Sequence, residues 1–349
     1  MWKKTLIGVG ILAGLGLSLA AAAYGYIRSL DLESVPSADP ATTAADIPFI
    51  RDGIKQSRGK ILAVVTSTPK IGQSDKRAGY ELTELSRAYY VFVANGYEVD
   101  IASPRGGEAP MTLDDGLVEA DYAFLNDPTA QAKVSNTLAI EAVDASQYRA
   151  VYFVGGKGAM FDLPDNPHVQ RIVKKVYETG VVGAVCHGPA ALLNVKSNNG
   201  EPFLANRRMT GFTNAEELFL MDNARELFPY LLQDQAGKVG AKFVEAPMYL
   251  DNTVVDGRLI TGQNPWSTWS VAEAMVQALG HTPIARDVTA EEYSVGLLAI
   301  YHTRGLATAL DEKARLPRFD KKLILMHALV AAMRARLGEA YALQQLARS

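Results

Sequence analysis

Cys186 is the only thiol in this chain of 349 residues, and His187 follows it directly. The residues before the cysteine are small or β-branched and predict a buried strand, Val181–Val185. Residues 188–193 predict a tight turn and the first turns of a helix. A reactive side chain at such a turn is a nucleophile elbow, which lifts the sulfur out of the sheet, while the helix N-terminus favours a thiolate. We therefore expect Cys186 to be a nucleophile. The alternative is a free cysteine that packs as a small hydrophobic residue.

His187 is the second candidate for chemistry. An imidazole beside a thiol can accept the thiol proton or protonate an oxyanion near neutral pH. The alternative is a core histidine that donates a hydrogen bond to a backbone carbonyl.

The elements that must position these side chains alternate along the chain. Apolar runs and helical spacing predict strands at residues 61–66, 97–102 and 151–154, and helices at residues 81–95 and 168–178. This alternation is typical of an α/β fold with a doubly wound, mostly parallel sheet sandwiched by helices. Such sheets bind ligands at the carboxyl ends of their strands. Cys186 and the turn Gly155-Gly156 both follow a strand, so we expect them at the same edge.

Composition excludes several classes of protein. Apolar residues make up 48% of the chain and charged residues 21%, as in globular proteins and unlike disordered ones. The net charge of -3 gives no reason to expect nucleic-acid binding. A single cysteine excludes an intrachain disulfide and a cysteine-rich zinc site, and no other metal site is predicted.

The N-terminal segment predicts a transmembrane helix that anchors the protein in a membrane. Residues 5–27 carry no charged side chain, and about 20 apolar residues span a bilayer. Lys3 and Lys4 favour a cytoplasmic N-terminus, so we expect the folded part on the periplasmic or extracellular side. One alternative is a secretory signal, cleaved near the alanines 20–23, that releases the protein. The other alternative is a helix in a soluble core.

We expect four regions along the chain: the anchor or signal segment 1–28, a flexible linker 29–58, a catalytic domain 59–281 and a helical extension 282–349. Prolines and small polar residues without a period characterise the linker. Apolar stretches at residues 294–301 and 323–333 predict two helices in the extension. The second is too short to span a membrane. It packs on the domain or on a partner subunit, or it lies on the membrane surface.

Seven motifs between Lys60 and Gly280 follow one another in order: Gly79–Leu85, Gly96–Val99, Ala102–Gly107, Phe161–Pro164, Ala184–Pro189, Thr210–Glu217 and Asp256–Pro265. Together they resemble the ThiJ/PfpI superfamily. The resemblance implies a flavodoxin-like sheet of the class I glutamine-amidotransferase-like type. Within the superfamily the chain is most similar to the branch of glutathione-independent glyoxalases (glyoxalase III), with related heat-shock holding chaperones and proposed deglycases.

The resemblance implies further site residues. A glutamate of the first helix hydrogen-bonds the cysteine in this superfamily, and Glu84 stands at the matching place. A carboxyl group beside a thiolate in a partly dry pocket must hold its proton, because two close anions repel each other. The alternative is an ordinary solvent-facing helix charge. Some relatives orient the histidine with a downstream acid, and Asn214, Glu216 and Glu217 are the candidates. The sequence leaves that choice open, and a helix-surface charge is the default for both glutamates.

The resemblance also implies an oxyanion hole of backbone N–H groups, which maps to Gly156 or Lys157 after the Gly155-Gly156 turn and to His187. A Gly-Gly pair is also simply a tight turn. The chain departs from its branch at Lys157, where relatives commonly carry histidine. A lysine there can lower the pKa of Cys186, attract anionic substrates or change the chemistry.

The implied activity converts an α-oxoaldehyde such as methylglyoxal into a hydroxy acid, without a metal or organic cofactor. Cys186 adds to the aldehyde carbon, and Glu84 or His187 moves a proton between the adjacent carbons through an enediol. A homodimer is implied as well. Two other functions stay open on this fold. One is a stress-related holding chaperone whose Cys186 senses oxidants, and the other is an amidohydrolase with the same nucleophile.

Overall fold

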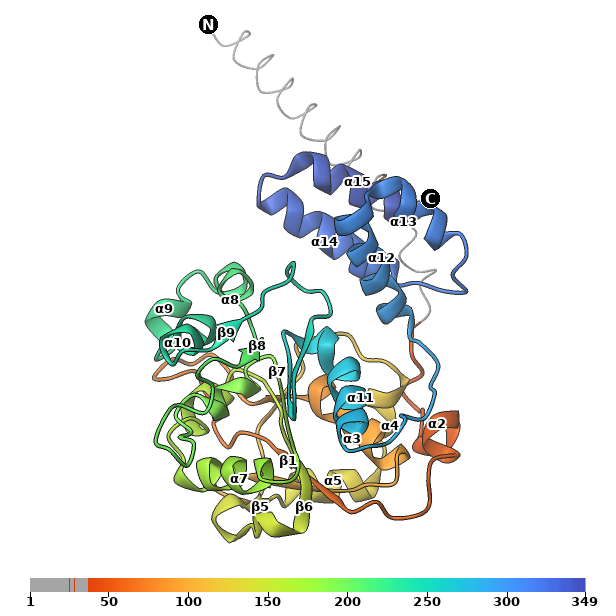
Figure 1. Cartoon of the computed structure of the whole chain (residues 1–349). Coiled ribbons are helices and arrows are strands. Elements are labelled where there is room, and N and C mark those ends of the chain that lie inside the picture. Colours follow the sequence, from red (N-terminus) through yellow and green to blue (C-terminus); the bar gives the residue numbers. More distant parts are fainter. Residues whose placement is uncertain (1–24, 26–27, 29–36, 349) are drawn as a thin grey trace, which may run out of the picture. The chain divides into compact units, whose positions relative to one another are not determined.

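The computed structural model describes residues 25, 28 and 37–348 (Figure 1). The chain divides into two compact units. One spans Ala38–Asp287 and contains all the predicted site residues, and the other includes the C-terminal residues from Val288.

The first unit is built around a seven-stranded sheet with the strand order β10-β11-β7-β6-β1-β3-β5, and two smaller sheets pair β2 with β4 and β8 with β9. Its strands are β1 (Lys60–Val64), β2 (Tyr80–Glu81), β3 (Glu98–Ser103), β4 (Met111–Thr112), β5 (Leu138–Ala139), β6 (Tyr148–Phe153), β7 (Val181–Val185), β8 (Arg208–Met209), β9 (Lys242–Phe243), β10 (Thr253–Asp256) and β11 (Leu259–Gly262).

Helices connect these strands. The α-helices of this unit are α2 (Pro48–Arg51), α3 (Leu82–Ala94), α4 (Glu119–Leu125), α5 (Pro128–Ser135), α6 (Ala159–Asp162), α7 (Pro167–Tyr177), α8 (Asn214–Leu220), α9 (Ala224–Leu227), α10 (Leu232–Lys238) and α11 (Thr268–Ala278). The 3₁₀ helices are η2 (Ala44–Asp46), η3 (Ile140–Ala142), η4 (Ala145–Gln147), η5 (Gly188–Leu192) and η6 (Pro265–Ser267).

Every strand pair of the main sheet is parallel except β10 with β11. Helices α3 and α11 pack on one face of the sheet and α7 on the other (Figure 1). The central strands β6 and β7 are therefore covered on both sides, which explains their nearly continuous apolar sequence. This arrangement confirms the predicted mostly parallel sheet flanked by helices.

The individual elements predicted for this domain are present with their ends shifted by a few residues. Gly96 ends α3 with φ of 83°, a left-handed conformation that favours glycine, and its N–H donates to the Val93 carbonyl. Each of these elements was predicted from local patterns alone.

The predicted fold class needs one correction, which concerns the N-terminal transmembrane helix. In the described part of the chain, no helix is long and apolar enough to cross a membrane. The segment on which that prediction was made, residues 5–27, lies outside the described residues except for Gly25. A membrane partner is therefore not supported. A location on the far side of a membrane stays an untested prediction.

The segment predicted as a flexible linker contains local structure in its second half. Helices η2 and α2 lie within it, and the Ile54 N–H donates to the Ala94 carbonyl. The Arg58 N–H donates to the carbonyl of Gly96. These bonds attach the segment to the end of α3, so the first unit begins at Ala38, before the predicted domain boundary.

The second unit contains helices α12 (Ala290–Arg304), α13 (Leu306–Lys313), α14 (Lys321–Met333) and α15 (Leu337–Arg348). Two of them cover the predicted helical stretches. Helix α14 packs against α15 and α12 within the same unit, which buries Ile324 and Leu343. A hydrogen bond from the Ser294 hydroxyl to the Asp320 carbonyl, 2.9 Å long, joins α12 to the start of α14.

Candidate active site

Cys186 lies at the carboxyl end of β7 in a strained backbone conformation. Its φ is 57°, in the left-handed region that residues with a side chain rarely adopt. Two backbone bonds hold it there: its N–H donates to the Gly262 carbonyl at 3.0 Å, and its carbonyl accepts from the Phe212 N–H at 2.8 Å. This is the sharp turn expected of a nucleophile elbow. The residue is only 4% exposed.

The element after the cysteine differs from the prediction. Residues Gly188–Leu192 form the short 3₁₀ helix η5 rather than the first turns of an α-helix. So short an element has only a weak dipole. Neighbouring side chains must therefore decide the protonation of the sulfur.

His187 connects the sulfur to an acid. Its Nδ1 lies 3.3 Å from Sγ of Cys186, and its Nε2 lies 2.7 Å from Oε2 of Glu217. An ionised carboxylate only accepts hydrogen bonds, so this partner assigns the proton to Nε2 and leaves the lone pair of Nδ1 facing the thiol. The ring also packs against Phe212 and Phe228, with centroid distances of 4.7 Å and 6.1 Å, which fix its orientation.

Among the three candidates for orienting the histidine, the structure brings Glu217 to His187. Both glutamates are buried, so the default of a helix-surface charge was wrong. Glu216 caps α8 instead, because its Oε2 accepts from the N–H and hydroxyl of Thr213. Asn214 points to Asp234, at 2.6 Å. The pattern Thr-x-x-Glu at 213–216 is a capping-box signature, and it could have separated the two glutamates from sequence.

Glu84 lies in the first turn of α3 and is completely buried. Its carboxyl group lies within hydrogen-bonding range of the Cys186 thiol, although neither oxygen has a partner with good hydrogen-bond geometry. The hydroxyl of Tyr152 in β6 donates to the Glu84 carbonyl at 2.8 Å and holds the first turn of the helix against the sheet. Glu84 is therefore part of the site and not a solvent-facing charge.

Cys186 and Glu84 form a coupled pair of acids. Burial raises the pKa of the Glu84 carboxyl well above its usual value, and the neighbouring Glu81 raises it further, while the nearby Cys186 thiol acts against both. Burial and the Glu84 carboxylate likewise raise the pKa of the Cys186 thiol. Two such acids do not both ionise at neutral pH, so the pair carries at most one negative charge.

The Gly155-Gly156 turn, which follows β6, approaches the nucleophile. A Cβ atom at Gly155 would lie 2.3 Å from Oε2 of Glu84 and 2.8 Å from Cβ of Cys186, so only glycine fits there. The N–H groups of Val154 and Gly158 donate to backbone carbonyls. The N–H groups of Gly156, Lys157 and His187 take no part in those bonds, which leaves them suited to an oxyanion.

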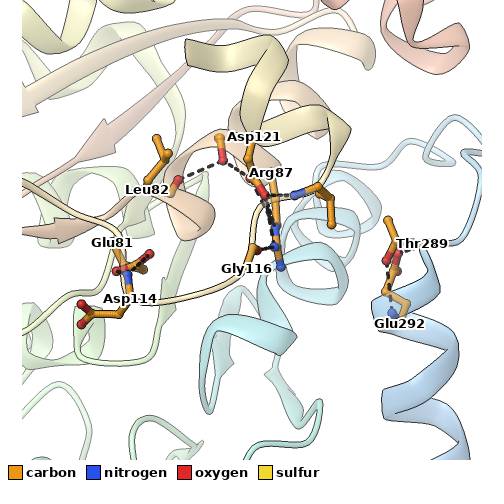
Figure 2. A network of polar contacts seen from close by, with 10 residues as sticks. Glu81, Leu82, Arg87, Asp114, Gly116, Asp121, Thr289 and Glu292 are labelled. Atoms are coloured by element: carbon orange, nitrogen blue, oxygen red, sulfur yellow. Dashed lines mark hydrogen bonds and ion pairs between the residues drawn. The ribbon is translucent and has the colours of Figure 1, made fainter. Parts of the chain in front are cut away.

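Lys157 carries a partner that the sequence did not reveal. Its Nζ lies 2.5 Å from Oδ2 of Asp114, in the segment that follows β4. Two further contacts hold this segment: the Asp114 N–H donates to the carboxyl group of Glu81, and Arg87 donates to the Gly116 carbonyl at 3.2 Å (Figure 2).

Arg87 is itself held by a buried ion pair. Its Nη2 lies 3.1 Å from Oδ2 of Asp121, and both side chains are fully buried (Figure 2). Ser86 donates to the other oxygen of that carboxylate at 2.5 Å. This ion pair joins α3 to α4, and through Arg87 it holds the segment of residues 113–118 that follows β4.

Two acids next to Asp114, Glu81 and Asp115, have raised pKa values. Burial, followed by the charges of Asp115 and Asp114, raises the pKa of Glu81 to about 8. Burial raises the pKa of Asp115 to about 6, although Arg87 acts against it.

Among the described residues, no group of three or more His, Cys, Asp and Glu side chains is arranged to hold a metal ion.

The arrangement offers a nucleophile, a base and an acid in one buried site. His187, polarised by Glu217, can take the thiol proton, and protonated Glu84 also lies near the sulfur. The free N–H groups near Gly156 and His187 are available for a developing oxyanion. This set is suited to covalent addition of the thiol to a carbonyl carbon.

The model of the DJ-1/PfpI family matches residues 77–278. "Glyoxalase 3" of Candida albicans is 32% identical over 230 residues, which cover 63% of this chain and 98% of that protein. A "Glutathione-independent glyoxalase" of Saccharomyces cerevisiae is also 32% identical, over 235 residues that cover 63% of this chain and 98% of its own.

Solved structures show the same likeness. The crystal structure of glyoxalase III from Candida albicans has a TM-score of 0.58 and 31% identity, and it covers 63% of this chain and 97% of its own. The Rapid Encystment Protein of 24 kDa from Francisella tularensis has a TM-score of 0.60 and 34% identity, with coverage of 64% and 100%. The residues that the family model matches, 77–278, lie within the unit that contains the site.

Proposed function

Because the chain belongs to the DJ-1/PfpI family, we propose that it is a cysteine-dependent, glutathione-independent glyoxalase that converts α-oxoaldehydes such as methylglyoxal into 2-hydroxy acids. The observation that carries this proposal is the convergence of Glu84 and the His187–Glu217 pair on the buried thiol of Cys186. Two relatives of about one third identity are named for this activity.

The reaction begins when His187 accepts the thiol proton and Cys186 adds to the aldehyde carbon. The carbonyl oxygen takes up a proton, which gives a hemithioacetal. Glu84 is protonated because of its burial, and it can supply that proton and then act as a base.

The next step moves a proton between neighbouring carbons. The base removes the proton from the hemithioacetal carbon to form an enediol, and the adjacent carbon receives a proton. A thioester of Cys186 with the 2-hydroxy acid results. Water hydrolyses the thioester, releases the acid and restores the thiol. The net change adds one water to the α-oxoaldehyde, so no external oxidant or reductant is consumed.

The test is lactate formation from methylglyoxal without glutathione, with Cys186→Ser as the control. We expect turnover by the wild type and none by the variant, because serine is far less nucleophilic at neutral pH. Absence of lactate from the wild type, with Cys186 still readily alkylated, would overturn the proposal. Release of ammonia from amides would then identify an amidohydrolase, and suppression of aggregation that survives Cys186→Ser a holding chaperone.

The family resemblance further suggests a homodimer. The chemistry described above involves residues of one chain, so the site does not depend on a second copy for these groups.

A further inference from the structure

The ion pair between Lys157 and Asp114 lies at the turn that forms one side of the active site. The Lys157 side chain is 21% exposed and the Asp114 side chain 53% exposed, so the ammonium is the inner partner and the carboxylate the outer one. Lys157 follows Gly155, whose backbone lies against Glu84 and Cys186, and Gly156, whose backbone lies against residues 79–81.

The ammonium of Lys157 is within electrostatic reach of the nucleophile. Burial lowers the pKa of Lys157, but Asp114, Cys186 and Glu217 together hold it above its usual value. The lysine therefore remains charged at neutral pH beside the groups that do the chemistry. Glu84 and Glu81 hold their protons at neutral pH, so they do not cancel this charge.

Asp114 marks a position at which a carboxylate already binds. Its segment is anchored independently of this carboxylate, through the Asp114 N–H on Glu81 and the Gly116 carbonyl on Arg87. A partly exposed ion pair contributes little to stability. Another carboxylate can therefore take the place of Asp114 on Lys157 while the segment stays anchored.

We propose that Lys157 is a specificity residue that selects α-oxoaldehydes with a carboxylate at the far end of the molecule, which displaces Asp114. This inference rests on the glyoxalase activity proposed above and names its substrate class. The reaction is unchanged: the thiol adds to the aldehyde carbon, one water is consumed, and the product is a 2-hydroxy dicarboxylic acid. The second carboxylate only binds, and it neither gains nor loses a bond.

The first experiment compares two substrates that differ at the end far from the aldehyde, where 4,5-dioxopentanoate carries a carboxylate and its methyl ester is neutral. Its readout is the ratio of the two kcat/KM values, in which any general change of activity cancels. We expect the wild type to favour the anion, and Lys157→Met to lose about tenfold of that preference. Lys157→Arg, which keeps the charge, should retain most of it. A ratio that does not change between the wild type and Lys157→Met overturns the inference, while turnover of both substrates leaves the glyoxalase proposal intact.

The second experiment does not depend on turnover. Alkylation of the full chain by iodoacetate and by iodoacetamide is followed by mass, and because Cys186 is the only cysteine, the added mass reports that residue alone. We expect the rate ratio of the anionic to the neutral reagent to fall about tenfold in Lys157→Met and to rise in Asp114→Asn, where the competing carboxylate is gone.

The two experiments separate the two proposals. If neither aldehyde is turned over, the glyoxalase proposal fails. The alkylation ratio then decides by itself whether Lys157 selects anions. If the alkylation ratio is the same in the wild type, Lys157→Met and Asp114→Asn, Lys157 selects no anion and the inference is wrong.

Discussion

At the scale of single residues, the glutamates of the site have different roles because their surroundings differ. Glu84 is enclosed without a well-aligned hydrogen-bond partner, so it holds a proton and faces the thiol. Glu217 contacts His187 and orients it. Glu216, the preceding residue in the chain, accepts hydrogen bonds on both carboxylate oxygens and has a structural role. Chemically identical side chains thus differ in function because of their partners.

The adjacent glutamates provide a matched pair of variants. Glu217→Gln should lower kcat about 10²-fold with little change in stability, because the neutral amide polarises His187 less. Glu216→Gln should instead destabilise the protein by about 2–3 kcal/mol, because an amide N–H₂ would face the donors that now bind both carboxylate oxygens. Lactate formation and urea unfolding of both variants check this division. Equal losses of kcat in the two variants would contradict it.

Glu81 makes stability depend on pH. Its pKa is raised from 4.5 to about 8 in the folded protein, so the folded state holds this proton more tightly than the unfolded state. Its contribution is complete below about pH 4.5 and is lost as the pH rises to about 8. Relative to Glu81→Gln, which cannot ionise, the wild type should lose on the order of 2–4 kcal/mol across this range. Urea unfolding of both proteins at several pH values measures it, and parallel pH profiles would refute the assignment.

At the scale of elements, two consecutive turns of the sheet create the site. The turn after β7 presents Cys186, and the turn after β6 passes so close that Gly155 has no room for a side chain. The first turn of helix α3 brings Glu84 close to both of them. Because β6 and β7 are adjacent and parallel, the turns that follow them meet at the carboxyl edge of the sheet.

A methyl group at Gly155 tests this close approach. Gly155→Ala should destabilise the protein by about 1–3 kcal/mol and reduce lactate formation, because the new Cβ would collide with Glu84 and with the Val185 carbonyl. Gly237→Ala is the control: this glycine lies in α10 with nothing within 4 Å of a new Cβ, so the change should be neutral or slightly stabilising. The two variants are compared by thermal unfolding and activity. An active and stable Gly155→Ala protein would contradict this prediction, because it would show that the turn can shift to accommodate a Cβ atom.

At the scale of the whole molecule, the chain consists of two compact units with separate cores. All residues of the site lie within Ala38–Asp287. Residues 281–289, between α11 and α12, have no helix or strand. The four helices of the second unit bury their own apolar residues, among them Leu298, Ile324 and Leu343. A unit with its own core is expected to fold independently.

A protein of residues 38–287 should therefore form lactate with about the kcat of the full chain, if the glyoxalase proposal holds. The measurement is a comparison of kcat and of urea unfolding for the two proteins. An insoluble or inactive fragment, beside an active full chain, would show that the second unit contributes to folding or to the site.

The sequence by itself determined the central strands β1, β3, β6 and β7, the helices α3 and α7, and the position of Cys186 at a turn. These features follow from local patterns, because a buried parallel strand is apolar along its length and an elbow needs small residues around it. Three sequence-based predictions were wrong. Residues 188–192 form a 3₁₀ helix, no described helix can cross a membrane, and Glu216 and Glu217 are buried rather than on a helix surface.

Only the tertiary structure decided which residues meet at the thiol. Glu217 lies 30 residues after His187, and whether it or Glu216 faces the imidazole depends on how α8 is rotated against the turn after β7. The partner of Lys157 was equally hidden, because Asp114 belongs to a different segment, 43 residues earlier, that α3 and α4 hold in place. Contacts of this kind depend on the packing of whole elements, and no local pattern of residues encodes that packing.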